Sequence, residues 1–296
     1  MPPLVRRLIL RSPSPLHRLS KPALFTSHRS HSTQLLSPQQ QPPSSSSVSA
    51  AEVSHFNALA STWWDPHGPS RLLHLMNPLR HDFIASCLSQ DASPPSTPDK
   101  HLRYLDVGCG GGIFAESAAR LPATSSVTAI DPSPSVYCVA LEHAKTDPSI
   151  RKTLTYHNTS IEDFPAPTTA ADKYDILTLF EVIEHVKHPA PFLESCFPFV
   201  KPGGWIVLST IARTWTSWLT TKVVAEDLVG VVPRGTHEWS QYINEEELRE
   251  WFAKQREWGD ARAVGVVYMP GIGWREVNGG ERWGNYFFGV RKKEGL

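Results

Sequence analysis

The chain has 296 residues, of which 40% are hydrophobic, and it contains four cysteines without the spacing of a metal finger. No apolar run approaches the roughly 20 residues of a membrane-spanning helix, so composition argues against an integral membrane protein. Six basic and no acidic residues lie in 1–51, which leaves 23 basic against 29 acidic side chains in the rest, and such an acidic body argues against nucleic acid as a partner.

Residues 1–36 are rich in Arg and Ser and free of acidic residues, the composition of a mitochondrial transit peptide. In 4–10, "LVRRLIL", apolar residues alternate with arginines as in a short basic amphipathic helix. A disordered basic tail is the alternative, and a secretory signal is disfavoured because no uninterrupted apolar core follows the first charges. Residues 37–51 predict a disordered Pro/Ser/Gln-rich linker, so we expect the folded domain at 52–296.

The first part of this domain, 52–101, is expected to form an N-terminal helical cap. Residues 52–65 have apolar side chains at helical spacing. A helical pattern resumes at 71–88 around Pro78, and the Pro/Ser-rich composition of 89–101 predicts a loop.

Strands and helices then alternate, which predicts a parallel sheet covered by helices on both faces. After a helix at 244–254, two close strands suit an antiparallel pair at the sheet's edge. The expected strands are 103–108, 126–131, 154–160, 174–180, 205–211, 263–269 and 285–291, with helices at 112–121, at 135–145 and from about 181.

Residues 214–243 interrupt this alternation. They are apolar and Trp-rich, but their periodicity is untidy. The segment is expected either to cap a substrate pocket or to lie on a membrane surface, and a plain core helix is the alternative.

A glycine turn follows the first strand of the alternating region. The strand ends in Asp106, and Gly108, Gly110 and Gly112 come before the next helix. Glycines let the backbone approach a ligand closely, and a helix N-terminus favours negative groups. Asp131 ends the second strand, where an acid can accept hydrogen bonds from both ribose hydroxyls of an adenosine.

The form of the turn distinguishes between nucleotide cofactors. The dinucleotide pattern G-x-G-x-x-G, counted from Gly108, requires glycine where Ile113 stands; counted from Gly110 it ends at Ala115, which is permissible but less natural. The D-x-G-x-G-x-G form at 106–112 instead resembles the class I S-adenosylmethionine methyltransferases. That resemblance implies a Rossmann-like α/β fold, with a mostly parallel seven-stranded sheet, an antiparallel edge strand and helices on both faces.

A closer resemblance lies outside the cofactor motifs. The chain resembles the ubiquinone-biosynthesis O-methyltransferases in "FNALASTWWDPHGPSRLLHLMNPLR", "LDVGCGGG", "EVIEHV", "VKPGGW" and "PRGTHEW". This family implies methylation of phenolic hydroxyls on polyprenylated catechol rings, namely a dihydroxy-polyprenylbenzoate and demethylubiquinol. It also implies peripheral association with the matrix side of the mitochondrial inner membrane, in a complex with other ubiquinone-synthesis enzymes.

The same resemblance implies that Arg80, Gly108, Asp131 and Phe180 line the site for S-adenosyl-L-methionine. The fork of Arg80 suits the carboxylate of the cofactor's methionine part, and Phe180 offers an apolar wall. The alternatives are a surface ion pair for Arg80 and simple core packing for Phe180.

The segment "TLFEVIEHVKHP" (178–189) carries the remaining candidates. In a helix beginning near 181, Glu181, Glu184 and His185 would project from one face at the carboxyl end of a parallel strand, where such sheets bind ligands. Two carboxylates and an imidazole suit a divalent ion, and the family is described as binding magnesium through this motif. We expect Glu181 and His185 to be catalytic, with His185 as general base the alternative to the metal. Acids in a first turn can also serve the helix dipole alone.

Two other functions remain open. The acceptor could be another small catechol or acid, or the chain could be a non-catalytic scaffold with a methyltransferase-like fold. The glycine turn and Asp131 disfavour the scaffold because it would not need them.

Overall fold

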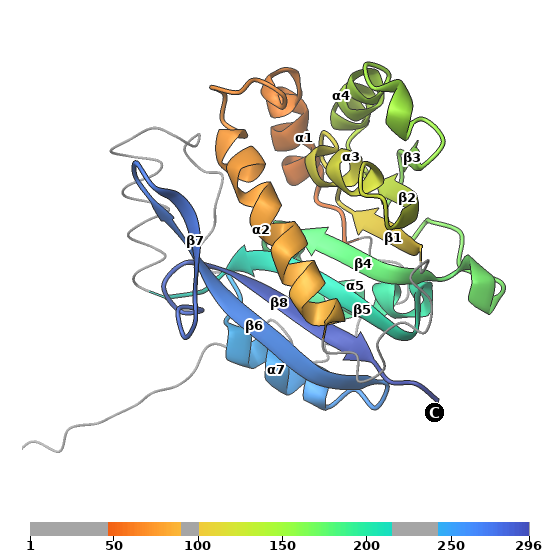
Figure 1. Ribbon diagram of the computed structural model, residues 1–296, viewed down its shortest axis with the longest axis vertical. Helices are drawn as coiled ribbons and strands as arrows, with labels where there is room; N and C mark the ends of the chain where they lie inside the picture. The colour runs from red at the N-terminus through yellow and green to blue at the C-terminus, as the bar shows by residue number, and fades with distance from the viewer. Residues whose placement is uncertain (1–46, 90–100, 215–241, 296) are drawn as a thin grey trace, which may run out of the picture. The chain divides into compact units, whose positions relative to one another are not determined.

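The computed structural model describes residues 47–89, 101–214 and 242–295 (Figure 1). All of them lie in the compact unit Ser32–Leu296. The expected transit peptide, residues 37–46 of the linker, nearly all of the loop and most of the 214–243 insertion fall outside the described residues. The last two residues of the expected linker, Ala50 and Ala51, are instead helical, because they begin the first helix of the domain.

Five parallel strands form one part of the sheet, as the alternating pattern predicted. Their order is β3-β2-β1-β4-β5, so the order reverses between β1 and β4. Ligands bind at such a switch point, beyond the carboxyl ends of the strands. The strands are β1 (Leu102–Val107), β2 (Thr124–Ile130), β3 (Leu154–His157), β4 (Tyr174–Phe180) and β5 (Val200–Ile211).

Antiparallel strands complete the sheet beyond β5. The strand β8 (Asn285–Lys292) lies between β5 and β6 (Trp258–Met269), which confirms the two expected strands as neighbours. A further strand, β7 (Gly273–Val277), pairs with β6 at the outer edge. The sheet of the described residues therefore has eight strands rather than seven, because the turn around Gly271 folds the chain back onto β6.

Helices cover both faces of the sheet. Figure 1 shows α2 crossing the near face, with α5 and α7 on the far side. Two hydrophobic cores result because side chains alternate along each strand: in β4, Leu177 and Leu179 pack toward α5 and α7, while Ile176 and Phe180 pack toward α2, α3 and α4. The helices are α1 (Ala50–Leu59), α2 (Arg71–Leu88), α3 (Ile113–Ala119), α4 (Pro134–Ala144), α5 (Pro189–Cys196) and α7 (Glu245–Ala253).

Short 3₁₀ turns lie between these elements. One of them, η2, continues α1 directly and completes the expected N-terminal helical segment. They are η2 (Ala60–Thr62), η3 (Pro148–Ile150), η4 (Ala170–Asp172), η5 (Ile183–His185) and η6 (Phe197–Phe199).

The expected helix from about 181 is wrong. Only the three-residue turn η5 forms there, and the α-helix begins at Pro189. Glu181 has a φ of 57°, and Val186 is extended. Both conformations prevent a continuous helix, whereas Pro189 is pre-organised for a first helical position.

Candidate active site

A cavity of about 630 Å³ lies at the carboxyl ends of β1, β2 and β4. Its walls come from α1, α2, the loops after these strands and the β6–β7 hairpin. All the predicted cofactor residues line it, as do Glu181 and His185, whereas Glu184 does not. The fold therefore brings six of the seven predicted site residues to one cavity.

The glycine turn closes this cavity where β1 ends. Gly108 and Gly110 have φ values of 69° and 55°, in the left-handed region that favours glycine. A Cβ atom on Gly108 would lie 2.7 Å from Val182 Cγ2, and one on Gly110 would lie 2.3 Å from Trp63 Cζ2. Both positions therefore require glycine for space as well as conformation.

Asp131 joins the glycine turn to the loop after β2. Its Oδ2 accepts a hydrogen bond from the Gly110 N–H and its Oδ1 one from the Ser133 N–H, both at 2.9 Å. Burial raises the pKa of Asp131 to about 6, although these two backbone donors pull it down. Each carboxylate oxygen keeps a lone pair, so the group is held in place and can still accept from ribose hydroxyls.

Arg80 and Asp106 line the cavity but are buried, at 4% and 2% exposure, and each has one buried polar atom without a hydrogen-bond partner. Arg80 Nε and Asp106 Oδ2 have none, while Asp106 Oδ1 accepts from Thr178 Oγ1 at 2.7 Å. Burial lowers the pKa of Arg80 and raises that of Asp106 to about 7. Neither forms an ion pair with another described residue, so Arg80 is not a surface ion pair. An unpaired cation and anion fit the carboxylate and ammonium of an amino acid.

Phe180 lies both in the hydrophobic core and in the cavity lining. It belongs to the core on the α2 side, where its ring meets Phe114 at 4.7 Å between centroids. It also lines the cavity, with the Arg80 guanidinium 4.8 Å from its ring centroid. The ring therefore supports Arg80 from the side of the sheet.

Glu181 lies at the end of β4 in a left-handed conformation, which costs about 1–3 kcal/mol for a residue with a side chain. Its N–H donates to Ser209, and its carboxylate accepts from Ser209 Oγ at 2.7 Å and from Asn285 Nδ2 at 3.4 Å. The hydrogen bonds from Ser209 on β5 and Asn285 on β8 stabilise this strained conformation. In it, Glu181 is part of the cavity lining.

His185 also faces the cavity, and its partner comes from α1. Its Nδ1 lies 2.8 Å from Glu52 Oε2, and its ring meets Phe56 edge-on at 5.0 Å. Burial lowers the pKa of His185, but the hydrogen bond to Glu52 and the charges of Glu184, Glu52 and Glu181 raise it above its ordinary value.

These three side chains do not fit a shared metal site as arranged here. Glu184 points away from the cavity, is 3% exposed and accepts from Thr210 Oγ1 at 2.9 Å. Burial raises its pKa, and the charge of Glu181 adds to the effect. In the described part of the chain, no group of three or more His, Cys, Asp or Glu side chains could hold a metal ion. Without the continuous helix, the predicted common face does not exist.

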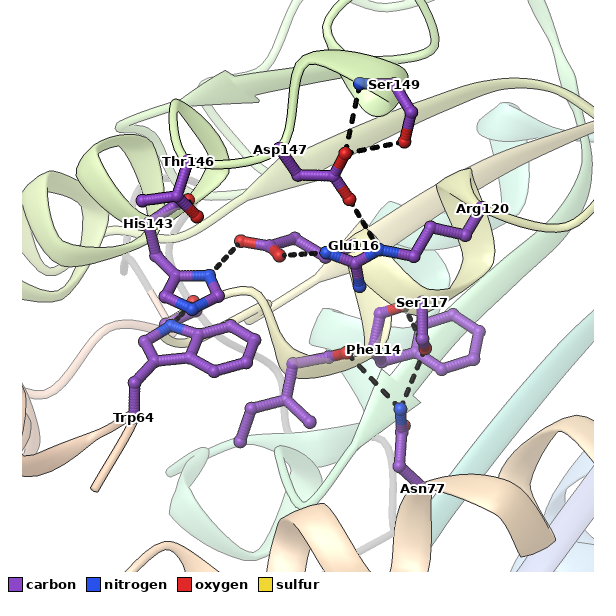
Figure 2. A network of polar contacts seen from close by, with 12 residues as sticks. Trp64, Asn77, Phe114, Glu116, Ser117, Arg120, His143, Thr146, Asp147 and Ser149 are labelled. Atoms are coloured by element: carbon purple, nitrogen blue, oxygen red, sulfur yellow. Dashed lines mark hydrogen bonds and ion pairs between the residues drawn. The ribbon is translucent and has the colours of Figure 1, made fainter. Parts of the chain in front are cut away.

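The residues that support the glycine turn were not among the predicted site residues. Trp64 Nε1 donates to the Gly111 carbonyl at 2.9 Å, and its ring stacks on His143 at 3.4 Å (Figure 2). His143 Nδ1 lies 2.8 Å from Glu116, a fully buried carboxylate that also pairs with Arg120. The WWD motif was noticed only as a resemblance, so its contact with the turn was not foreseen.

The NPLR motif supports the helix that follows the turn. Asn77 Nδ2 donates to the Ile113 carbonyl at 3.3 Å and to Ser117 Oγ at 2.7 Å (Figure 2). It thereby fixes the first turn of α3 against α2. The two motifs of the helical cap thus hold the cofactor loop from two sides.

Comparisons with known proteins agree with this site. The family model described as a methyltransferase domain matches residues 52–255. A mitochondrial ubiquinone biosynthesis O-methyltransferase of Candida albicans is 38% identical over 285 residues, covering 83% of this chain and 86% of the relative. That of Schizosaccharomyces pombe is 45% identical over 224 residues, covering 76% and 77%.

The chain belongs to the ubiquinone-biosynthesis O-methyltransferase family. Solved structures support the fold expected of such a methyltransferase. The plantazolicin methyltransferase BpumL, in complex with SAH, has a TM-score of 0.54 at 14% identity, covering 82% of this chain and 97% of that one. A SAM-dependent methyltransferase of Thermotoga maritima has a TM-score of 0.54 at 16% identity, covering 82% and 99%.

Proposed function

We propose that this chain transfers the methyl group of S-adenosylmethionine to a phenolic oxygen of a polyprenylated catechol ring in ubiquinone biosynthesis. Its relatives are named ubiquinone biosynthesis O-methyltransferase. The observation that carries the proposal is one cavity whose lining includes Asp131, Arg80 and Asp106, which we call its polar end, and apolar side chains of α2 and the β6–β7 hairpin, which we call its apolar end. His185 and Glu181 also line this cavity.

The polar end would hold the cofactor by three groups. Asp131 accepts from the ribose hydroxyls, Arg80 pairs with the methionine carboxylate, and Asp106 accepts from the ammonium. The cofactor supplies an electrophilic methyl carbon on a sulfonium. Fixing this carbon in line with an acceptor oxygen contributes about 7–11 kcal/mol to such reactions, and these contacts provide that alignment.

The apolar end would hold the acceptor. Its walls are side chains of α2 and the β6–β7 hairpin, and Trp274 Nε1 ties the two together by donating to the Leu72 carbonyl at 3.0 Å. A prenyl tail gains about 25 cal/mol for each Å² of surface that it buries here. The lining side chains are Leu72, Leu73, Met76, Val266, Tyr268 and Trp274.

His185 is the group that we propose takes the phenolic proton. Glu52 holds Nδ1, so Nε2 is the atom that would accept it. As the oxygen–methyl bond forms, the carbon–sulfur bond breaks toward neutral S-adenosylhomocysteine. The imidazolium that results is stabilised by Glu52, and Glu181 adds negative charge nearby.

Magnesium remains a prediction from the family resemblance, since the three expected ligands are not gathered here. Glu181→Ala combined with Glu184→Ala, assayed across a magnesium, manganese and zinc titration, tests it. Loss of a metal response that the parent protein shows would support an ion at these residues. An unchanged rate and response would remove the ion from the mechanism.

We also propose peripheral association with the matrix side of the mitochondrial inner membrane, in a complex with other ubiquinone-synthesis enzymes. Relatives from three yeasts and the mouse are named mitochondrial. In the part of the chain that the structure describes, no helix is long and apolar enough to cross a bilayer. Flotation with cardiolipin-containing liposomes tests the association, and protein that stays at the bottom of the gradient would contradict it.

The experiment that tests the reaction uses purified protein, S-adenosylmethionine and a short-chain prenylated dihydroxybenzoate. We expect a monomethylated product and one equivalent of S-adenosylhomocysteine. No turnover with magnesium, manganese or zinc present would contradict the proposal. Faster turnover of an unprenylated catechol would favour a small-molecule acceptor, and failure to bind S-adenosylhomocysteine would favour a scaffold.

A further inference from the structure

The helix α1 covers the cofactor end of the cavity and meets the hydrophobic core through Phe56, which packs, partly buried, against the cluster of Ala60, Trp63, Ile113 and Val136. None of its residues is buried, yet Glu52, Val53, Phe56 and Leu59 line the cavity. A helix with so little buried apolar surface is held mainly by specific contacts, and such elements open at low free-energy cost.

Asn57 provides two of these contacts, and both lie at the N-terminus of α4. Asn57 Oδ1 accepts from Ser133 Oγ at 2.7 Å and from the Ser135 N–H at 3.0 Å. The first N–H groups of a helix have no partner within it and are usually satisfied by the side chain of the N-cap residue. Ser133, the N-cap of α4, makes no such bond. Asn57 therefore caps α4 from a helix more than 70 residues away in the chain.

This cap leads directly to the residue that we assign to the ribose. The Ser133 N–H donates to Asp131 Oδ1, and Asp131 Oδ2 accepts from the Gly110 N–H. A continuous set of hydrogen bonds thus runs from α1 through Ser133 and Asp131 to the glycine turn. Glu52, which also lies on α1, contacts His185 in the loop after β4.

The other end of the covering segment is firmly fixed. Trp63 is 8% exposed, and its carbonyl lies 3.0 Å from His74 Nε2. Trp64 is held by Gly111 and by the stacked ring of His143. The segment therefore has a fixed end at Trp63 and Trp64. We treat this end as a pivot about which the unburied helix α1 can move.

We propose that Asn57 is a positioning residue for the cofactor: it latches α1 over the bound ligand and fixes the loop that carries Asp131. The proposal rests on the proposed function, because it assigns Asp131 to the ribose of S-adenosylmethionine. Cofactor exchange then requires α1 to swing away on the Trp63–Trp64 pivot, which breaks the two Asn57 contacts and the contact between Glu52 and His185.

The variants Asn57→Ala and Asn57→Asp test this proposal in the full chain. Alanine removes the acceptor oxygen, whereas aspartate keeps it and adds a charge that a helix N-terminus favours. By calorimetry, we expect Asn57→Ala to weaken S-adenosylhomocysteine binding about tenfold, since two hydrogen bonds are lost, and Asn57→Asp to bind as the parent does. Ser54→Ala, on the exposed face of α1, is the matched control and should bind normally.

Hydrogen exchange supplies a second readout that a purely structural role would not give. We expect amides of 50–59 to exchange more slowly with S-adenosylhomocysteine bound in the parent protein, and this protection to be lost in Asn57→Ala. The KM for S-adenosylmethionine should rise in that variant, with kcat little changed. Equal affinities for the parent and Asn57→Ala, or equal weakening in both Asn57 variants, would overturn the proposal. A parent protein that binds no S-adenosylhomocysteine would overturn the proposed function as well.

Discussion

Arg80 and Asp106 line the same cavity, and neither forms an ion pair with another described residue. A buried charge costs several kcal/mol unless another group compensates it, and in the function that we propose the zwitterionic end of the cofactor provides this compensation. The raised pKa of Asp106 and the lowered pKa of Arg80 both follow from this burial.

Asp106→Asn should therefore stabilise the cofactor-free protein above neutral pH. The folded-state pKa of Asp106, about 7, exceeds its ordinary value of 3.8. Its contribution to stability is thus complete below pH 3.8 and is lost as the pH rises through about 7. We expect the variant to gain on the order of 3 kcal/mol in unfolding free energy at pH 8 and nothing near pH 4. Urea unfolding at both values measures this, and an equal effect at both would contradict the assignment.

The same substitution should weaken cofactor binding, because the amide cannot match the charge of the ammonium. We expect S-adenosylmethionine affinity to fall at least tenfold, given about 1.5–3 kcal/mol for a hydrogen bond to a charged group. Calorimetry checks this. Thr178→Val, which removes the donor to the other carboxylate oxygen, is the comparison variant and should have the smaller effect.

The pKa of His185 predicts how the rate of the reaction depends on pH. A base acts in its deprotonated form, and the pKa of His185 lies above its ordinary value, so the rate should rise with pH through a midpoint above 6.5. Glu52→Gln removes the charge that stabilises the imidazolium and should move the midpoint to lower pH, with a lower plateau rate. Initial rates at saturating substrates measure both, and an unmoved midpoint would contradict the role of His185.

At the scale of elements, the β6–β7 hairpin and α2 form the wall assigned to the prenyl tail. Trp274→Phe removes the N–H donor to the Leu72 carbonyl but keeps an aromatic ring. We expect kcat/KM to fall several-fold for long-tailed acceptors and little for a short-tailed one, because the wall loosens far from the reacting oxygen. Trp205→Phe, a buried Trp outside this cavity, is the control. An equal loss for both tail lengths would contradict the assignment.

At the scale of the whole molecule, residues 1–36 are the expected mitochondrial transit peptide. Fused to a fluorescent protein, they should direct it to mitochondria in yeast cells. Replacing Arg6, Arg7 and Arg11 by glutamine should abolish this, since the basic face would be lost. Cytosolic fluorescence from the unmodified fusion would contradict the prediction.

Some elements of the fold were predicted correctly from the sequence and one was not, and the difference has a physical reason. The strand 174–180 and the helix 71–88 were placed correctly because their apolar periodicity is strong and local. The helix expected from 181 does not form, because Glu181, at its expected start, has a left-handed backbone conformation. Ser209 and Asn285 on other strands hold Glu181 in that conformation. The predicted metal site depended on that helix and lost its geometry with it.

Taken alone, the sequence determined the alternating α/β fold, the glycine turn with Asp131, and the family, because each is written in local spacing or in contiguous motifs. Only the tertiary structure decided that Arg80 and Asp106 line one cavity without an ion-pair partner among the described residues, that Glu184 does not line it, and that Asn57 caps α4. These features are contacts between side chains far apart in the chain. No local periodicity encodes them, since they arise only when packing brings the helices and loops together.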